Sequence, residues 1–225
     1  MTRPALEILY IDNHLIAVLK PGGLLTQADH TGEDSLMEET RQWIRNEYNK
    51  TGNIFLGMVH RLDRNVSGVV LFARTSKAAS RISKQFREGT PTKIYRAIVH
   101  GTLKEKQTTL IHYLRKEKSL KATVFPRETP LAKRAELYYE VIGSFEKKSL
   151  IEVTLSTGRF HQIRAQMAFT GHPILGDVKY GAPDPLADHK IALHACKLTF
   201  NHPISNEETT VTAPDPEDWV DVGAV

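Results

Sequence analysis

The stretch from Gly57 to Arg74 restricts the possible fold more than any other part of the chain. In it, a polar loop that places Asp63 between Arg61 and Arg64 runs directly into the apolar segment 68–73. A short apolar run that follows turn-forming residues predicts a buried strand. The loop is therefore fixed at one end to a rigid element, which is the arrangement that catalytic loops usually need.

Asp63 itself is predicted to lie on a tight bend, because Asn65, Ser67 and Gly68 all favour turns over helix. Two neighbouring guanidinium groups favour the ionised carboxylate, which can act as a nucleophile or a general base. An ordinary surface ion-pair loop explains the same pattern, and from spacing alone it is the more common case.

The composition fits a cytoplasmic, soluble globular protein. The chain has 225 residues, of which 40% are hydrophobic and 25% charged, enough for one large domain or two small lobes. It shows no apolar run of membrane-spanning length and no apolar leader, and Cys196 is its single cysteine. The net charge of +4 permits an anionic partner such as nucleic acid without requiring one.

Local patterns predict a strand-rich chain with three main helices. Strands are expected at residues 7–11, 15–19, 68–73, 93–100, 135–142, 149–155 and 194–200. Helices are expected from Ser35 to Tyr48, from a Ser76 cap to Gly89, and across residues 160–171. The basic segment 103–134 is predicted to be a protruding hairpin or loop, either simply solvated or able to grip phosphates.

A second polar cluster lies at the start of the third helix. Its members are Arg159, His161, Gln162 and Arg164. Helix N-terminal amides and two arginines aimed at one spot would bind an anion, either Asp63, a phosphate or both. His161 and His172 lack a third ligand at a familiar spacing, so no metal site is predicted.

Five segments, in order, resemble the motifs of the RluA-type family of RNA pseudouridine synthases. HRLDRNVSG (60–68) resembles the catalytic loop and KIYRAIVHG (93–101) the strand that carries an active-site tyrosine. Segments 9–24, 157–181 and 191–203 are similar to the opening, third and closing motifs. Any one motif is weak, but together they cover nearly the whole chain and outweigh the ion-pair explanation for Asp63.

The resemblance implies an α+β fold, with a central mixed, mostly antiparallel sheet flanked by helices and a catalytic cleft across it. It implies a single catalytic domain over residues 1–225, acting as a monomer. Because the pattern begins within the first ten residues, no appended N-terminal RNA-binding domain is expected. The predicted strands and helices agree with this fold.

The resemblance also implies a reaction. Uracil is detached from C1′ of its ribose, rotated and rejoined through C5, in a tRNA or rRNA stem-loop. Asp63 would be the essential carboxylate, attacking C1′ or removing a proton from C2′. Tyr95 would stack on the flipped uracil, although most such tyrosines are core residues, and Arg164 would pair with Asp63 or brace the helix to a loop. No cofactor or metal is expected, because substrate and product are isomers.

The remaining site residues implied by the resemblance are expected to contact RNA or substrate. They are His60, Arg61, Arg64, Lys93, Arg159, His161, Gln162 and Ile163. His60 has an alternative structural role in holding the loop. The chain departs from the family pattern at Val66, Phe160 and the pair Ala165-Gln166, and these changes could alter a loop hydrogen bond or the RNA contact surface.

Two other functions use the same residues. A catalytically silent RNA-binding or ribosome-assembly protein would keep the basic surface without needing Asp63, yet Asp63, Tyr95 and Arg164 are all present. A carboxylate-dependent nucleoside or glycoside hydrolase would normally carry a second acid beside the first, and none stands out in these motifs.

Overall fold

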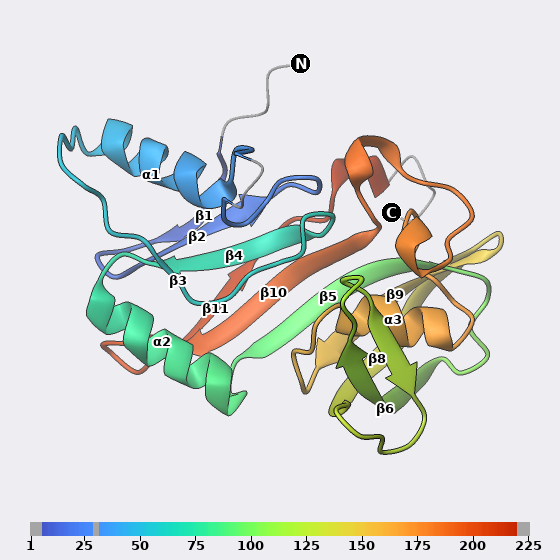
Figure 1. Ribbon diagram of the computed structural model, residues 1–225. Coiled ribbons are helices and arrows are strands. Elements are labelled where there is room, and N and C mark those ends of the chain that lie inside the picture. The colour runs from blue at the N-terminus through green and yellow to red at the C-terminus, as the bar shows by residue number, and fades with distance from the viewer. Residues whose placement is uncertain (1–5, 29–31, 220–225) are drawn as a thin grey trace. The chain divides into compact units, whose positions relative to one another are not determined.

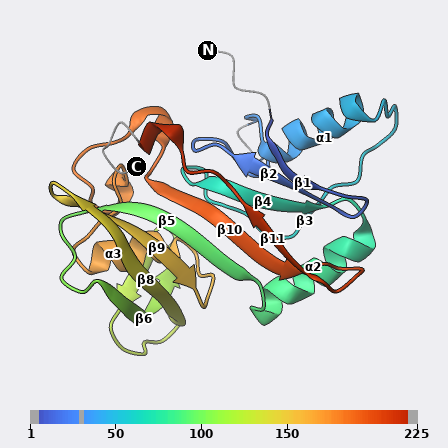
Figure 2. The ribbon, with the colours of Figure 1, turned by 180° about the vertical axis from the view of Figure 1, so that it is seen from behind.

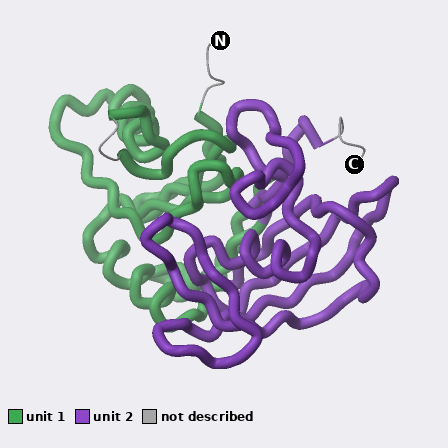
Figure 3. Tube along the Cα trace, turned by 45° about the vertical axis from the view of Figure 1, so that its right-hand side comes forward, with its two compact units in different colours: residues 1–91, 197–213 green, residues 92–196, 214–225 purple. Residues whose placement is uncertain are grey.

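The structure, a computed structural model, describes residues 6–28 and 32–219 (Figure 1). The chain divides into two compact units (Figure 3): residues 1–91 with 197–213, and residues 92–196 with 214–225. Strand β10 (Leu193–Asn201) contributes its first residues to the second unit and its last to the first.

The first unit is a sheet covered by helix α2. Its elements are β1 (Ile8–Ile11), β2 (Leu15–Lys20), α1 (Leu36–Glu47), β3 (Gly57–Met58), β4 (Ser67–Ala73), α2 (Ser76–Glu88) and β11 (Glu208–Thr212). Neighbouring strands run in the order β1-β2-β4-β10, and β11 pairs with β10 (Figure 2). Leu71, Ile82 and Phe200 belong to the core between this sheet and α2.

The register of β2 against β4 positions the candidate catalytic loop. The two strands are antiparallel, and Lys20 at the end of β2 lies opposite Gly68 at the start of β4. Residues 69–73 are buried, as the apolar run predicts. The loop before β4 is therefore held next to the end of β2.

The two helices of this unit begin and end much as the sequence predicts. Ser35 is the N-cap of α1 and accepts a hydrogen bond from the Glu38 amide. Gly89 ends α2 in the left-handed conformation, with φ of 73°. The predicted cap of α2 is wrong by one residue, because Thr75 accepts from the Ala78 amide and Ser76 already lies in the helix.

The second unit is an antiparallel sheet against which helix α3 packs. Its elements are β5 (Thr92–His100), β6 (Gln107–Lys116), β7 (Ala122–Phe125), β8 (Lys133–Phe145), β9 (Lys148–Leu155) and α3 (Gln162–Phe169), with short 3-10 helices at Val178–Tyr180, Ala187–His189 and Glu217–Trp219. The strand order is β5-β9-β8-β6-β7. Leu114, Ala135, Ala165 and Tyr180 form a core cluster here.

The fold class is α+β, as predicted, and the basic segment 103–134 does form a hairpin from β6 and β7. Strands β3 and β11 were not predicted, and α3 starts later than expected. The residue before α3, His161, has φ of 51°, so Arg159 and Phe160 precede the helix. No helix in the described ranges is both long and apolar enough to cross a membrane.

Candidate active site

The bend that carries Asp63 is anchored on both sides by buried side chains. Leu62 is 6% exposed and Val66 is 3% exposed, while Asp63 between them is half-buried. The Val66 amide donates to the Asp63 carbonyl at 3.1 Å, which closes the predicted turn. Thr26 donates to the Leu62 carbonyl at 2.8 Å, so a second loop also holds the bend.

Lys20 fixes the backbone directly after Asp63. Its side chain is fully buried, and its Nζ donates to the carbonyls of Pro21 at 2.8 Å and Arg64 at 2.9 Å. The Gly23 amide donates to the same Arg64 carbonyl at 2.8 Å. One donor at the end of β2 and one in the turn after it therefore hold the peptide that follows the carboxylate.

The charge of Lys20 is linked to that of Asp63. Burial lowers the pKa of the Lys20 ammonium to about 7, because water no longer solvates the charged form. The negative charge of Asp63 acts in the opposite direction, whereas Arg64 adds to the lowering. The sequence analysis missed Lys20; the available signal was one charged residue ending the buried strand LIAVLK.

Arg64 has a partner that was not predicted. Its guanidinium forms a bidentate ion pair with Glu33, with nitrogen to oxygen distances of 2.6 and 3.1 Å, and its Nε donates to the Gly23 carbonyl. Both side chains are exposed, so this pair contributes little stability. Within the first unit, Lys20 is the buried cation that interacts with Asp63.

His60 has the structural contacts that its alternative role requires. Its Nε2 accepts a hydrogen bond from the Leu71 amide at 2.9 Å. Its ring stacks on Phe86 of α2, with centroids 4.8 Å apart and planes at 12°. His60 therefore joins the candidate catalytic loop to β4 and α2, while its neighbour Arg61 is exposed.

In the second unit, Tyr95 lies on β5 and is half-buried, on the same strand face as the buried Ala97. Lys93 is the second residue of this strand, and its Nζ lies 4.0 Å from the point where a Cβ on Gly158 would stand. Burial lowers the pKa of the Lys93 ammonium. The start of β5 is thus close to the loop that precedes α3.

Gln162 holds that loop together. Its Oε1 accepts from the Arg159 amide at 2.9 Å and the Thr157 hydroxyl at 2.8 Å. Its Nε2 donates to the Glu136 carbonyl at 3.0 Å. A buried amide with three such bonds has a structural role.

Arg164 braces α3 to the loop that follows it. Its guanidinium forms a bidentate pair with Asp177 at 2.7 and 2.9 Å, and the two side chains are 4% and 1% exposed. Arg159 instead donates to the Arg134 carbonyl at 2.9 Å. Within the second unit the two guanidinium groups thus contact different groups, Arg164 the Asp177 carboxylate and Arg159 the Arg134 carbonyl, and their convergence on one anion stays a prediction.

His161 is held by Tyr180 in front of α3. The Tyr180 oxygen lies 2.9 Å from His161 Nδ1 and also accepts from the Ala122 amide at 2.7 Å. The His161 ring stacks on Phe160, with centroids 3.8 Å apart, and Lys116 Nζ lies 4.6 Å from the Phe160 ring centre. Tyr180, which the sequence analysis did not single out, thus connects β7 to the loop before α3.

The departures from the family pattern are mostly internal. Val66 is buried in the candidate catalytic loop. Gln166 is fully buried and lies within hydrogen-bonding distance of the Leu110 carbonyl and His112 Nδ1, on β6. Ile163 on the same helix is likewise buried, and an effect of the Ala165-Gln166 departure on the RNA contact surface stays a prediction.

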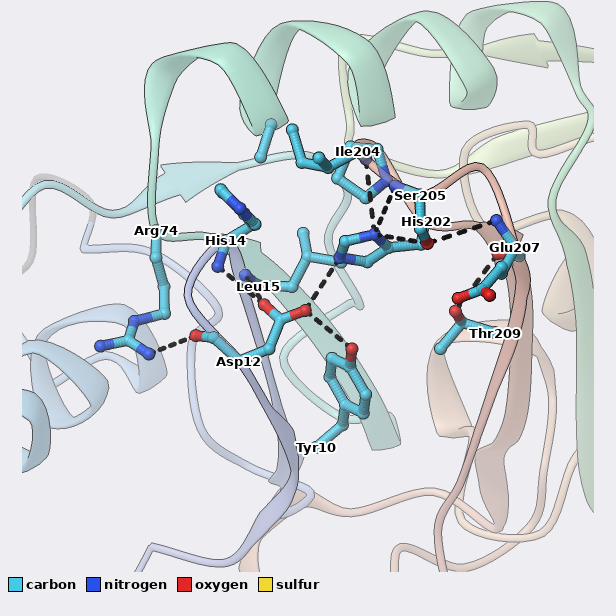
Figure 4. Close-up of polar contacts among 12 residues, drawn as sticks. Tyr10, Asp12, His14, Leu15, Arg74, His202, Ile204, Ser205, Glu207 and Thr209 are labelled. Carbon is cyan, nitrogen blue, oxygen red and sulfur yellow. Dashed lines mark hydrogen bonds and ion pairs between the residues drawn. The ribbon is translucent and has the colours of Figure 1, made fainter.

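A separate polar cluster in the first unit joins two turns (Figure 4). Asp12 accepts from the Tyr10 hydroxyl at 2.8 Å, and His202 Nε2 lies 2.8 Å from the same carboxylate oxygen. Burial opposes ionisation of Asp12, but hydrogen bonds from His14, Tyr10, Leu15 and His202 outweigh it and lower its pKa.

Around His202, the Ser205 hydroxyl and amide both contact Nδ1, at 3.1 and 3.2 Å. These contacts place Ser205, His202 and Asp12 in a series, yet all of them lie within two hairpin turns. The cluster is therefore a clamp between β1-β2 and β10-β11.

Comparison with known proteins shows which family this chain resembles along most of its length. The family described as RNA pseudouridylate synthase matches residues 14–169. The dual-specificity RNA pseudouridine synthase RluA of Pasteurella multocida (strain Pm70) is 35% identical over 220 residues, covering 95% of this chain and 94% of that protein. The tRNA pseudouridine synthase C of Vibrio parahaemolyticus serotype O3:K6 (strain RIMD 2210633) is 32% identical, covering 95% and 92%.

A solved structure shares the fold. Human RNA pseudouridylate synthase domain containing 4 superposes with a TM-score of 0.79 at 23% identity, over 95% of this chain and 90% of that one.

Proposed function

Because the chain belongs to the RNA pseudouridylate synthase family and is therefore an RNA pseudouridine synthase, we propose that Asp63 is its essential carboxylate and that it acts on uridines in tRNA or rRNA stem-loops. In this isomerisation the C1′–N1 bond breaks, the base turns, and a C1′–C5 bond forms. C5 then loses its proton and N1 carries one. No atom is gained or lost, so the proposal involves no redox partner.

The observation that supports Asp63 is its place on an anchored bend. Leu62 directly before it and Val66 three residues after it are both buried, and Lys20 holds the next peptide. Anchoring matters because a displacement of about 1 Å at a reacting group can cost about a hundredfold in rate. The carboxylate attacks C1′ or takes the C2′ proton, and both routes need it at the ribose.

Other residues have proposed roles in binding. Tyr95 stacks on the flipped uracil and assists proton loss from C5, since it is half-buried beside a small apolar neighbour. Arg61 is exposed next to the bend and contacts a phosphate or fills the place left by the flipped base. Lys93 and Arg159 supply further cations for the RNA backbone.

The names of the relatives support both substrate classes. One is called a tRNA pseudouridine synthase and another a ribosomal large subunit pseudouridine synthase. Unpaired loop nucleotides suit an enzyme that must take the base out of the stack, because extruding a paired base costs a few kcal/mol. Pseudouridine maps of cellular RNA with and without the protein would identify the uridine.

The central experiment compares wild type with Asp63→Asn. Tritium released from 5-³H-uridine in bulk cellular RNA is measured in single turnover, alongside filter binding to the same RNA. The amide keeps the size and most of the hydrogen bonds of the carboxylate, but it can neither attack C1′ nor remove a proton. We expect a folded variant that binds RNA with wild-type affinity or better and loses several orders of magnitude in rate.

Glu33→Gln is the matched control, because it removes an exposed carboxylate that pairs with Arg64 in the same unit. We expect it to retain activity within about threefold of wild type, as is usual for exposed ion pairs. Easily measured turnover by Asp63→Asn would remove Asp63 from the chemistry. RNA binding without tritium release by the wild-type protein would favour the catalytically silent RNA-binding alternative.

A further inference from the structure

Two leucines occupy left-handed backbone positions at one end of the second unit. Leu131 has φ of 65° and is 88% exposed, and Leu120 has φ of 55° and is 55% exposed. Leucine in this conformation is uncommon, since its Cβ crowds the following carbonyl, and glycine or asparagine usually takes such a place. Both side chains also expose a large apolar group to water, so folding explains neither choice.

Each leucine occupies a turn position that normally selects another residue. The Ala132 amide donates to the Thr129 carbonyl at 3.0 Å, with Pro130 and Leu131 between them. A turn with proline second and a positive φ third normally takes glycine or asparagine at the third position. In the β6-β7 hairpin, the Leu120 amide donates to the Glu117 carbonyl at 3.0 Å, and the left-handed residue of such a loop is usually glycine.

The strand registers bring both leucines to the same end of the sheet. Lys116 of β6 pairs with Ala122 of β7, which places the Leu120 turn beyond that end. Leu114 of β6 pairs with Lys133, the first residue of β8, so Leu131 projects in the same direction on the other side of β6. Neighbouring strands lie about 4.8 Å apart, so β7 and β8, which flank β6, are about 10 Å from each other.

Cations surround both leucines. The exposed basic side chains at this end are Lys116, Lys118, Lys121, Lys133 and Arg134. Among the nearby acids, Glu117 pairs with Arg115 and Glu136 with Arg134, and the charge of the exposed Glu128 is offset by the exposed Arg127 next to it, so the lysines leave a net positive charge. This end of the unit therefore combines positive charge with two protruding apolar groups.

We propose that Leu131 and Leu120 contact nucleobase faces of the substrate RNA while the surrounding lysines bind its phosphates, a surface role that rests on the proposed function. The charge selects a polyanion, and the apolar tips select one with accessible apolar faces. Unpaired RNA bases offer such faces, whereas a fully paired stem hides all but its terminal ones. Apolar side chains are known to wedge between bases in this way.

The test uses the full chain and two RNA probes: a hairpin with an unpaired uridine-containing loop, and a blunt duplex of the same stem sequence. Leu131→Asn and Leu120→Asn remove the apolar group but keep a residue that tolerates positive φ. We expect each variant to bind the hairpin at least about fivefold more weakly, with the duplex almost unaffected. Because no charge changes, the salt dependence of hairpin binding should stay the same.

Two controls separate base contact from other causes. Leu131→Met keeps an apolar side chain and should bind the hairpin within about twofold of wild type. Lys118→Gln should weaken binding to both probes and reduce the salt slope by about one unit. Thermal melting should show Leu131→Asn at least as stable as wild type, because asparagine accepts the left-handed conformation better.

If both asparagine variants bind the hairpin with wild-type affinity, the proposal is overturned, and contact with a protein partner becomes the explanation for the exposed leucines. Equal weakening on hairpin and duplex would also overturn it. Because binding is measured apart from tritium release, a wild-type chain that binds as expected but isomerises nothing would count against the proposed function alone.

Discussion

The Nζ atom of Lys20, whose side chain is fully buried, lies 2.9 Å from the carbonyl oxygen of Arg64. This bond holds the residue that directly follows Asp63. A fully buried ammonium is costly unless it is paired and hydrogen-bonded. Here two carbonyls accept from it, and Asp63 supplies the opposing charge. Lys20 therefore depends on Asp63 for charge compensation, and Asp63 depends on Lys20 for its position.

We predict that Lys20→Met slows turnover by at least about tenfold while leaving RNA affinity unchanged. Methionine replaces the lysine side chain as far as Cε but has no Nζ to donate to the Arg64 carbonyl, so the bend that carries Asp63 should lose its fixed position. Single-turnover tritium release and filter binding on one preparation make the comparison. Lys77→Met, an exposed lysine on α2, is the control and should behave as wild type.

Lys20 also predicts a pH dependence of stability. Its pKa in the folded protein is about 7, well below the ordinary lysine value that it regains on unfolding. Between these two values the unfolded chain binds a proton that the folded chain does not, so stability rises with pH. Below about pH 7 both states are protonated and this contribution is flat.

Denaturant unfolding at about pH 7, 8 and 9 should therefore show wild type gaining stability relative to Lys20→Met as pH rises. The difference between the two proteins cancels groups that titrate in both. Parallel curves for the two would show that the Lys20 ammonium is not destabilised by burial.

The sequence predicted the periodic elements well, because apolar spacing and caps act locally. The β2 and β4 strands, the Ser35 cap and the Gly89 helix end all follow from neighbouring residues. The start of α3 does not follow from neighbouring residues, because it depends on the hydrogen bond from Gln162 to the carbonyl of Glu136, which is distant in the sequence.

Polar partners separated in sequence were hardest to predict. Nothing local pairs Arg64 with Glu33, and Asp177 follows Arg164 by 13 residues in a separate loop. The bend at Asp63 could be predicted from its turn formers, whereas the burial of Lys20 could not, because a lysine after a strand is usually solvated.

The clamp at Asp12 should make the first unit sensitive to acid. The hydrogen bonds that lower the Asp12 pKa stabilise the folded protein above the ordinary aspartate value. That stability is lost as pH falls through the folded-state pKa. Asp12→Asn should cost about 1 kcal/mol at neutral pH and lose less stability on acidification than wild type does.

Urea unfolding at about pH 7 and at about pH 3, below the ordinary aspartate pKa, measures both effects. Asp188→Asn, which removes an exposed carboxylate, is the control. Equal loss of stability on acidification in wild type and Asp12→Asn would assign the acid sensitivity to other groups.

A test of Arg164 must separate its structural ion pair with Asp177 from any role in the chemistry. Arg164→Met leaves Asp177 buried without its partner, and such a change costs about 3–5 kcal/mol. Lost activity in this variant alone would therefore carry no information about catalysis. The double variant Arg164→Met, Asp177→Leu removes both charges, and we expect it to recover most of the lost stability, because an apolar pair often replaces a buried ion pair without penalty.

Turnover of the double variant then decides the role of Arg164. If Arg164 also orients Asp63, as the family resemblance implies, the double variant should fold and bind RNA but remain at least about tenfold slower than wild type, which corresponds to about 1.4 kcal/mol of barrier. If Arg164 is only a brace, turnover should return together with stability. Melting curves and single-turnover tritium release on both variants distinguish the two results, and wild-type rates in the double variant would limit Arg164 to the brace.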